Sequence, residues 1–152
     1  MTKQGKLTLH IDISGILKDA YQQSTLGFKR TDGVTGNIYI RHQTKRAYYR
    51  KYRNKLTDCV GRLYAIAVYY AIKDYLTNVE KIRFCRDIKF RHVKNYLNQL
   101  FVNHKGFKEI KLELNNPSNG KSNGHYPALK AFRNRSKAKK FLTLKMIESK
   151  LF

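Results

Sequence analysis

Residues Leu7 to Ile13 read L-T-L-H-I-D-I, and this stretch decides the fold. Aliphatic side chains occupy every second position, and Thr8, His10 and Asp12 alternate with them. Because successive side chains of an extended chain point to opposite faces, the pattern predicts a strand with one buried face. Asp12 then lies on the other face, near the carboxyl end of the strand.

Two more strands follow the first. Thr31 to Gly36 reads T-D-G-V-T-G, and glycines in such positions allow the positive φ that tight hairpin turns require. This turn joins a second strand at Thr25 to Arg30 to a third strand at Asn37 to Gln43. We therefore expect an antiparallel meander of three strands at the start of the chain.

The middle of the chain combines a basic segment, a helix and a strand. Lys45 to Lys55 mixes Arg and Lys with tyrosines and has no clean apolar face, which predicts an exposed basic connection. Thr57 can cap a helix from Asp58 to Leu76, whose apolar side chains on nearly all sides predict burial. A fourth strand is expected at Glu80 to Cys85.

The rest of the chain predicts a helix at Phe90 to Val102, a fifth strand at Glu109 to Leu114, a flexible loop at 115–124 and a terminal helix, continuous or broken, at Pro127 to Phe152. Strands separated by a helix are parallel through right-handed crossovers. The order β-β-β-α-β-α-β-α therefore predicts one α/β domain over residues 1–152. Its mixed sheet begins with the antiparallel meander and continues with parallel strands.

The charge of the chain restricts its partners. Its 152 residues include 32 Lys and Arg against 10 Asp and Glu, a net charge of +22, while 41% hydrophobic residues still permit a core. Self-repulsion at this charge is relieved by a polyanion, so DNA or RNA is the expected partner. A membrane partner is not expected, since the longest apolar stretch has roughly half of the ~20 residues that a bilayer span needs.

The two cysteines, Cys59 and Cys85, lie in different predicted elements and have no metal-binding spacing. We expect both to be reduced core residues. Because no apolar signal region precedes the first strand, a cytoplasmic location is expected. The sequence leaves open whether the protein is a monomer or a homodimer.

Two basic segments are expected to bind nucleic acid. Cations can bind phosphates while interleaved tyrosine rings stack on bases or sugars. The residues expected to bind are Lys45, Arg46, Tyr49, Arg50, Lys51, Arg53 and Lys55 in the first segment and Arg133, Arg135 and Lys137 in the second.

Asp12 and Asp87 stand near the ends of two predicted strands. Ligands of open α/β sheets bind beyond the carboxyl ends of the strands, so these carboxylates would converge if the strands are parallel neighbours. A divalent metal removes the repulsion between close carboxylates. With Asp58 as a third ligand, the pattern predicts a site for Mg²⁺ or Mn²⁺. The alternative is that all three acids are structural, as turn, helix-dipole and ion-pair residues.

This order of elements and acids resembles the ribonuclease H-like superfamily of nucleases, resolvases and transposases. Asp12 in L-H-I-D-I-S-G and Asp87 in I-R-F-C-R-D-I match the strand aspartates of that family. Asp58 in T-D-C-V-G-R-L-Y-A stands where the family has a helix Glu, and His125 in S-N-G-H-Y-P is placed like its loop histidine. The resemblance implies that Asp12, Asp58, Asp87 and His125 are catalytic, with two metal ions at the scissile phosphate.

The chain departs from that family at the fourth acid. The stretch from Ala128 to Lys145 contains no acid, which leaves Asn134 or the strand residue Glu113 as a substitute. A second nuclease geometry is the E-x-K triplet Glu109-Ile110-Lys111, which is similar to restriction-endonuclease-like folds.

The leading functional interpretation is a metal-dependent endonuclease of the junction-resolvase or ribonuclease H type. The alternative is a non-catalytic DNA- or RNA-binding protein of the ribosomal or nucleoid type. In that case the basic segments act and the acids are structural.

Overall fold

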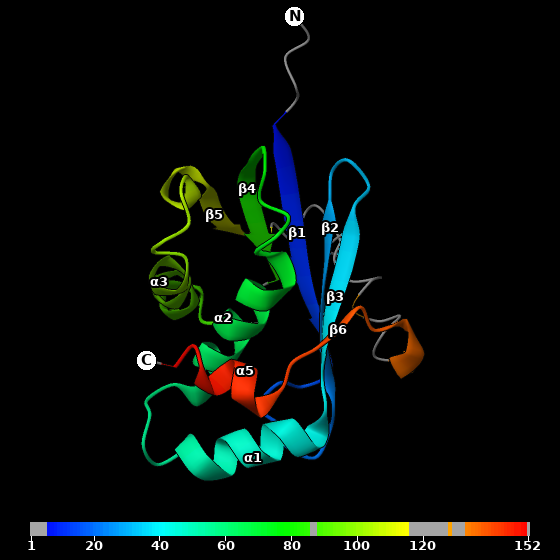
Figure 1. Cartoon of the computed structure of the whole chain (residues 1–152), viewed down its shortest axis with the longest axis vertical. Coiled ribbons are helices and arrows are strands. Elements are labelled where there is room, and N and C mark those ends of the chain that lie inside the picture. Colours follow the sequence, from blue (N-terminus) through cyan, green and yellow to red (C-terminus); the bar gives the residue numbers. More distant parts are fainter. Residues whose placement is uncertain (1–5, 86–87, 116–127, 129–132, 152) are drawn as a thin grey trace, which may run out of the picture.

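The computed structural model describes residues 6–85, 88–115, 128 and 133–151 (Figure 1). Its elements follow one another as β1 (Leu7–Ser14), β2 (Ser24–Arg30), β3 (Thr35–Ile40), α1 (His42–Tyr52), α2 (Cys59–Ile72), β4 (Val79–Phe84), α3 (Phe90–Leu100), η1 (Phe107–Glu109), β5 (Lys111–Leu114), η3 (Arg135–Lys137), β6 (Lys140–Phe141) and α5 (Leu144–Glu148).

The strands form one mixed sheet in the order β5-β4-β1-β2-β3-β6. β1 pairs with β2 and β2 with β3 in antiparallel fashion, whereas β4 is parallel to β1 and β5 is parallel to β4. The predicted α/β architecture, with an antiparallel meander joined by parallel strands, is thereby confirmed. The chain adds a short strand, β6, parallel to β3 at the far edge.

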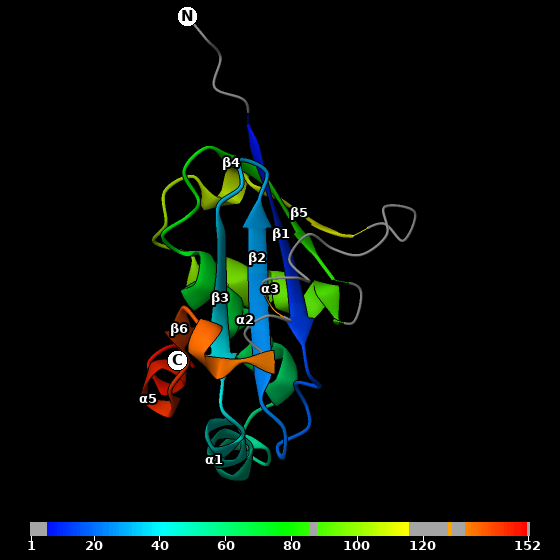
Figure 2. The same ribbon diagram turned by 90° about the vertical axis from the view of Figure 1, so that its right-hand side faces the viewer.

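Helices α2 and α3 pack together and cover one face of the sheet, as the two perpendicular views show (Figures 1 and 2). The core between these layers contains Leu9 and Ile11 of β1 and Leu63 and Ala67 of α2, all fully buried. Burial of α2 on most of its circumference explains its nearly continuous apolar sequence. No helix in the described part of the chain is long and apolar enough to cross a bilayer.

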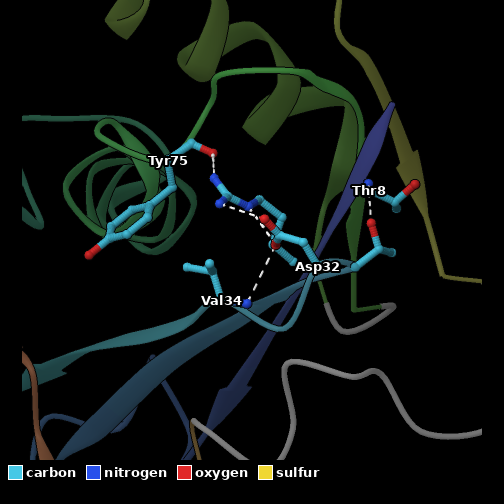
Figure 3. Close-up of polar contacts among 6 residues, drawn as sticks. Thr8, Asp32, Val34 and Tyr75 are labelled. Carbon is cyan, nitrogen blue, oxygen red and sulfur yellow. Dashed lines mark hydrogen bonds and ion pairs between the residues drawn. The ribbon is translucent and has the colours of Figure 1, made fainter. Parts of the chain in front are cut away.

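The β2–β3 hairpin is fastened at the end of the sheet opposite α1 (Figures 1 and 3). Arg30 donates two hydrogen bonds of 2.8 Å to the carboxylate of Asp32 and a third, of 3.0 Å, to the carbonyl oxygen of Tyr75. The Val34 amide donates to Asp32 within the same turn. The guanidinium of Arg30 lowers the pKa of Asp32, so this acid is committed to the turn.

The basic segment 45–55 was expected to be an exposed connection, and this expectation is wrong because most of it belongs to helix α1. The buried face of α1 consists of Lys45, Tyr48 and Tyr52. These positions have helical spacing, but a lysine and two tyrosines do not form the aliphatic stripe that usually reveals a buried helix face.

The tail was expected to form a terminal helix, continuous or broken, at Pro127 to Phe152, and the structure adds a strand to it. Its described part contains the short helix η3, strand β6 and the five-residue helix α5. Thr143 begins α5, since its hydroxyl accepts a hydrogen bond of 3.2 Å from the amide of Met146. Residues 116–124 of the predicted loop lie outside the described residues.

Candidate nucleic-acid interface

The carboxyl ends of β1, β3 and β4 point to the same end of the sheet, because these strands share one direction. Helix α1 starts directly after β3 and crosses this end (Figure 1). Ile11 of β1 pairs with Phe84 of β4, so the strands that carry Asp12 and precede Asp87 are parallel neighbours. The strand arrangement required for a site at this end is thus present.

Asp12 lies in β1 between two apolar residues of the helix-facing side. Ile11 is fully buried in the core, and Ile13 lines a cleft together with residues of α2. Asp12 therefore faces the opposite side of the sheet. Its Oδ1 accepts a hydrogen bond of 2.8 Å from the amide of Ile13.

Asp58 is the N-cap of α2, on the helix-covered side of the sheet. Its Oδ1 accepts a hydrogen bond of 3.2 Å from the amide of Gly61. Its Oδ2 lies 3.1 Å from Nδ1 of His92 and accepts a hydrogen bond of 3.3 Å from the hydroxyl of Tyr96. The structure thus gives Asp58 three partners within α2 and α3 and does not bring it together with Asp12.

Asp87 and His125, which were expected to be catalytic, lie outside the described residues. The convergence of Asp12 with Asp87 therefore stays a prediction, supported by the pairing of β1 with β4. Within the ranges that the structure describes, no three His, Cys, Asp or Glu side chains group together to hold a metal ion.

Glu113, the other acid considered for a fourth ligand, is engaged by cations. Its Oε1 lies 2.6 Å from Nε of Arg83 and 3.6 Å from Nζ of Lys81, and its Oε2 lies 3.6 Å from Nζ of Lys111. The hydrogen bond from Arg83 holds the pKa of Glu113 below its usual range. A metal ion here would face three positive charges.

The E-x-K geometry is also not present, because Glu109 ends helix η1 and Lys111 begins β5. The two residues therefore do not share one face of a strand, and this second nuclease interpretation is wrong.

The exposed side of α1 carries a row of arginines. Arg46, Arg50 and Arg53 are exposed and follow one another at intervals of four and three residues, which places them on one side of the helix. No Asp or Glu occurs between Asp32 and Asp58. We call Arg46, Arg50 and Arg53 the arginine row.

Lys45 is not a surface residue, so its predicted contact with nucleic acid is corrected. It has no exposed surface, and its Nζ donates hydrogen bonds of 2.9 Å to the carbonyl oxygens of Ile16 and Gln22 and to Oγ of Ser24. Burial lowers its pKa to about 8. Lys45 therefore holds the β1–β2 loop, residues 15–23, against α1.

Two further members of the predicted basic segment have partners within the protein. Tyr49 is partly buried, and its hydroxyl donates a hydrogen bond of 2.8 Å to the carbonyl oxygen of Leu17. Nζ of Lys51 lies 2.6 Å from the carboxylate of Glu148 in α5, which also accepts a hydrogen bond from Tyr52. Tyr49 is thus a loop anchor, and Lys51 is ion-paired with Glu148, whereas Lys55 is exposed.

The second predicted cluster lies near β3. Arg133, Arg135 and Lys137 are all exposed. Asn37 of β3 holds this segment by donating to the carbonyl oxygen of Lys137 and by accepting from the amide of Lys139. The guanidinium of Arg41, at the start of α1, lies 4.8 Å above the ring of Phe141 in β6. The second cluster thus lies beside Asn37 in β3, whereas the first begins beyond the carboxyl end of β3.

Tyr21, in the β1–β2 loop, is a surface residue that the sequence analysis missed. The residue is 79% exposed, and the guanidinium of Arg46 lies 5.2 Å from the ring centre. A lone tyrosine in a polar loop gives no periodic signal, so only its place beside α1 reveals it.

A cleft of about 650 Å³ opens at the carboxyl end of β1. Ile16 and Lys18 of the β1–β2 loop form one wall, and Asp58, Val60 and Lys89 belong to the helical side. The cleft is mainly apolar with lysines at its margin. It adjoins the loop that carries Tyr21 and so extends the candidate surface along the end of the sheet.

Comparison of the chain with protein-family models, with curated proteins and with solved structures gave no match.

Proposed function

We propose that this protein binds nucleic acid through the end of the sheet that α1 covers. The observation that carries the proposal is the arginine row, whose three guanidinium groups have no carboxylate partner in the part of the chain that the structure describes. Phosphates supply the negative charge that would neutralise this surface, and guanidinium groups match phosphate geometry. Both DNA and RNA carry the required backbone.

Salt dependence tests this function directly. Each phosphate contact contributes to the slope of log affinity against log salt, about 0.9 for a duplex and about 0.7 for a single strand. Arg50→Gln should therefore lower the magnitude of the slope by about that amount in anisotropy titrations with labelled oligonucleotides. Lys108→Gln, which removes one exposed cation from η1 beside the amino end of β5, is the control and should leave the slope unchanged.

Equal slopes for Arg50→Gln and Lys108→Gln would contradict the proposed surface. Their circular dichroism spectra should match that of the unaltered protein, because both side chains are exposed.

A ribonuclease H-like fold is the finer structural proposal. It is supported by the three-stranded meander, by the parallel attachment of β4 to β1 and of β5 to β4, and by a buried helix between β3 and β4. Asp12 then occupies the first-strand position of the family. Asp58, which stands at the helix position of the family, caps α2 and bonds to α3.

Metal-dependent cleavage is a second candidate function, favoured by the pairing of β1 with β4. Asp12 and Asp87 would hold Mg²⁺ or Mn²⁺, which would activate a water at the scissile phosphate. His125 would assist the release of product or the transfer of a proton.

Cleavage of labelled DNA and RNA with Mg²⁺, with Mn²⁺ and with a chelator tests this candidate. Asp12→Asn and Asp87→Asn should each abolish cleavage and leave binding intact. Asp74→Asn, at an exposed acid beyond the end of α2, is the matched control. Cleavage that survives Asp12→Asn would remove the nuclease assignment without affecting the binding proposal.

A further inference from the structure

The β1–β2 loop displays an aromatic ring at the proposed binding surface. Tyr21 is 79% exposed, the highest value among the exposed large hydrophobic side chains of the described residues. An exposed tyrosine by itself is ordinary on a protein surface. Its anchoring and its neighbours distinguish this one.

The loop that carries Tyr21 is held on both sides of the ring. Lys45 binds the carbonyl oxygens of Ile16 and Gln22, and the hydroxyl of Tyr49 binds the carbonyl oxygen of Leu17. These three hydrogen bonds come from α1 and reach positions before and directly after Tyr21. The ring is therefore presented by a fixed loop, although its side chain projects into solvent.

The backbone next to the ring is fixed as well. Oδ1 of Asp19 accepts a hydrogen bond of 2.9 Å from the amide of Tyr21, which closes a local turn. A ring on an ordered loop loses less conformational entropy when it binds than a ring on a mobile one.

The ring of Tyr21 also lies next to the first residue of the arginine row. Arg46 lies against Tyr21 at 5.2 Å, within the range of a cation–π contact, and Arg50 and Arg53 continue along α1. The distance along the helix axis from Arg46 to Arg53 is about 10 Å for a rise of 1.5 Å per residue. An aromatic platform followed by phosphate-binding groups is the arrangement that single-strand-binding surfaces use.

We propose that Tyr21 stacks on an unpaired base of a single-stranded nucleic acid while the arginine row contacts the phosphates that follow it. A duplex keeps its bases stacked inside, so a protruding ring has access to a base only where the base is unpaired. This inference rests on the proposed function and specifies the form of nucleic acid that the same surface selects.

The chain contains no tryptophan, so Tyr21→Trp introduces a single indole as a reporter. Its fluorescence should be quenched and shifted when a single-stranded oligonucleotide binds, and should change little with a duplex of equal length. Both titrations use the full chain at the same salt concentration.

Affinity measurements complete the test. Tyr21→Ala should lose about tenfold in affinity for single strands, as expected for one lost stacking contact, and less than about twofold for duplexes. Tyr21→Phe keeps the ring and should retain the affinity of the unaltered protein. Val102→Ala, at another exposed apolar residue that lies after α3, is the matched surface control and should change neither affinity.

Unchanged single-strand affinity in Tyr21→Ala, or an equal loss for single strands and duplexes, would overturn the inference while leaving the proposed function in place. If the unaltered protein binds neither form of nucleic acid, the proposed function fails and this inference fails with it.

Discussion

Nζ of Lys45 in α1 lies 2.9 Å from Oγ of Ser24 at the start of β2, and both residues are fully buried. An ammonium group has three donor hydrogens, and here all three find acceptors, the other two being carbonyl oxygens of the β1–β2 loop. The exposed loop and the basic helix are therefore joined through one buried cation.

Lys45→Met should lower the free energy of unfolding by about 2 kcal/mol at neutral pH, because the buried hydroxyl of Ser24 and two part-buried carbonyl oxygens lose their donor while the side-chain volume is kept. Urea denaturation measures the change. Hydrogen exchange should also show faster exchange in residues 15–23. Unchanged exchange in this loop would contradict the anchoring role of Lys45.

The same substitution should change the pH dependence of stability. Burial lowers the pKa of Lys45 from 10.5 to about 8, with Asp19 acting in the opposite direction. The unfolded chain therefore binds this proton more tightly, so the contribution of Lys45 to the free energy of unfolding rises as pH increases from about 8 to about 10.5. The difference in free energy of unfolding between the unaltered protein and Lys45→Met should increase by about 2 kcal/mol between about pH 7 and about pH 9.5.

That comparison is restricted to pH values below the ionisation of ordinary tyrosines. Burial raises the pKa of both Tyr48 and Tyr49, so above about pH 10 the unfolded chain loses protons first and stability falls. The tyrosine contribution is the same in the unaltered protein and in Lys45→Met, so it cancels in the difference between their free energies of unfolding. A difference that stays constant from about pH 7 to about pH 9.5 would show that Lys45 does not titrate in this window.

Substitutions of Asp58 should show how much the cap of α2 contributes to stability. Asp58 caps α2 with a left-handed backbone, φ 52°, a conformation that asparagine tolerates and alanine does not. Asp58→Ala should cost about 2 kcal/mol of stability. Asp58→Asn keeps the capping oxygen and should cost under about 1 kcal/mol, as measured by urea denaturation. Equal losses of stability in the two variants would contradict the capping role of Asp58.

Gly61→Ala should destabilise α2, even though alanine is about 1 kcal/mol more favourable than glycine in a helix interior. A Cβ at position 61 would lie 2.8 Å from both Oδ1 and Cγ of Asp58, so the capping carboxylate must move. We expect a net loss of about 1 kcal/mol, because a displaced cap outweighs the gain in propensity. In an Asp58→Gly background, Gly61→Ala should instead stabilise, and a thermodynamic cycle over the four proteins measures this reversal.

Glu148→Gln should strengthen nucleic-acid binding, because it releases Lys51 from its ion pair. The magnitude of the salt slope should increase by up to about 0.7 for a single strand. A matched change, Glu80→Gln at the exposed start of β4, removes one acid from the opposite end of the sheet and should have little effect. Identical slopes for both variants would show that Lys51 stays outside the binding surface.

The elements predicted most reliably from the sequence are those whose periodicity reflects burial. The alternation of Leu7 to Ile13 and the apolar run of α2 both follow from packing against a core, and the T-D-G turn marks the hairpin. Helix α1 was missed because its buried face depends on Lys45. A lysine becomes a core residue only where distant carbonyl groups converge on it, and a linear pattern does not contain that information.

The candidate site, like the fold, was predicted only in part. The parallel direction of β4 follows from crossover rules, and the basic character of residues 46–53 follows from composition, whereas the adjacency of β4 to β1 is seen only in the structure. The separation of Asp58 from Asp12 did not follow, because it depends on which side of the sheet each side chain faces. The role of Tyr21 depends on a loop whose position is set by α1.

The sheet keeps its longest strands inside and its shortest at its margins. β5 has four residues and carries Lys111 and Glu113, and β6 has two residues. A second chain would therefore find few open backbone groups to pair with, and charged side chains beside them. If a polyanion neutralises the charge of the protein, the repulsion between copies falls, and the short edge strands would still discourage edge-to-edge pairing of neighbouring copies.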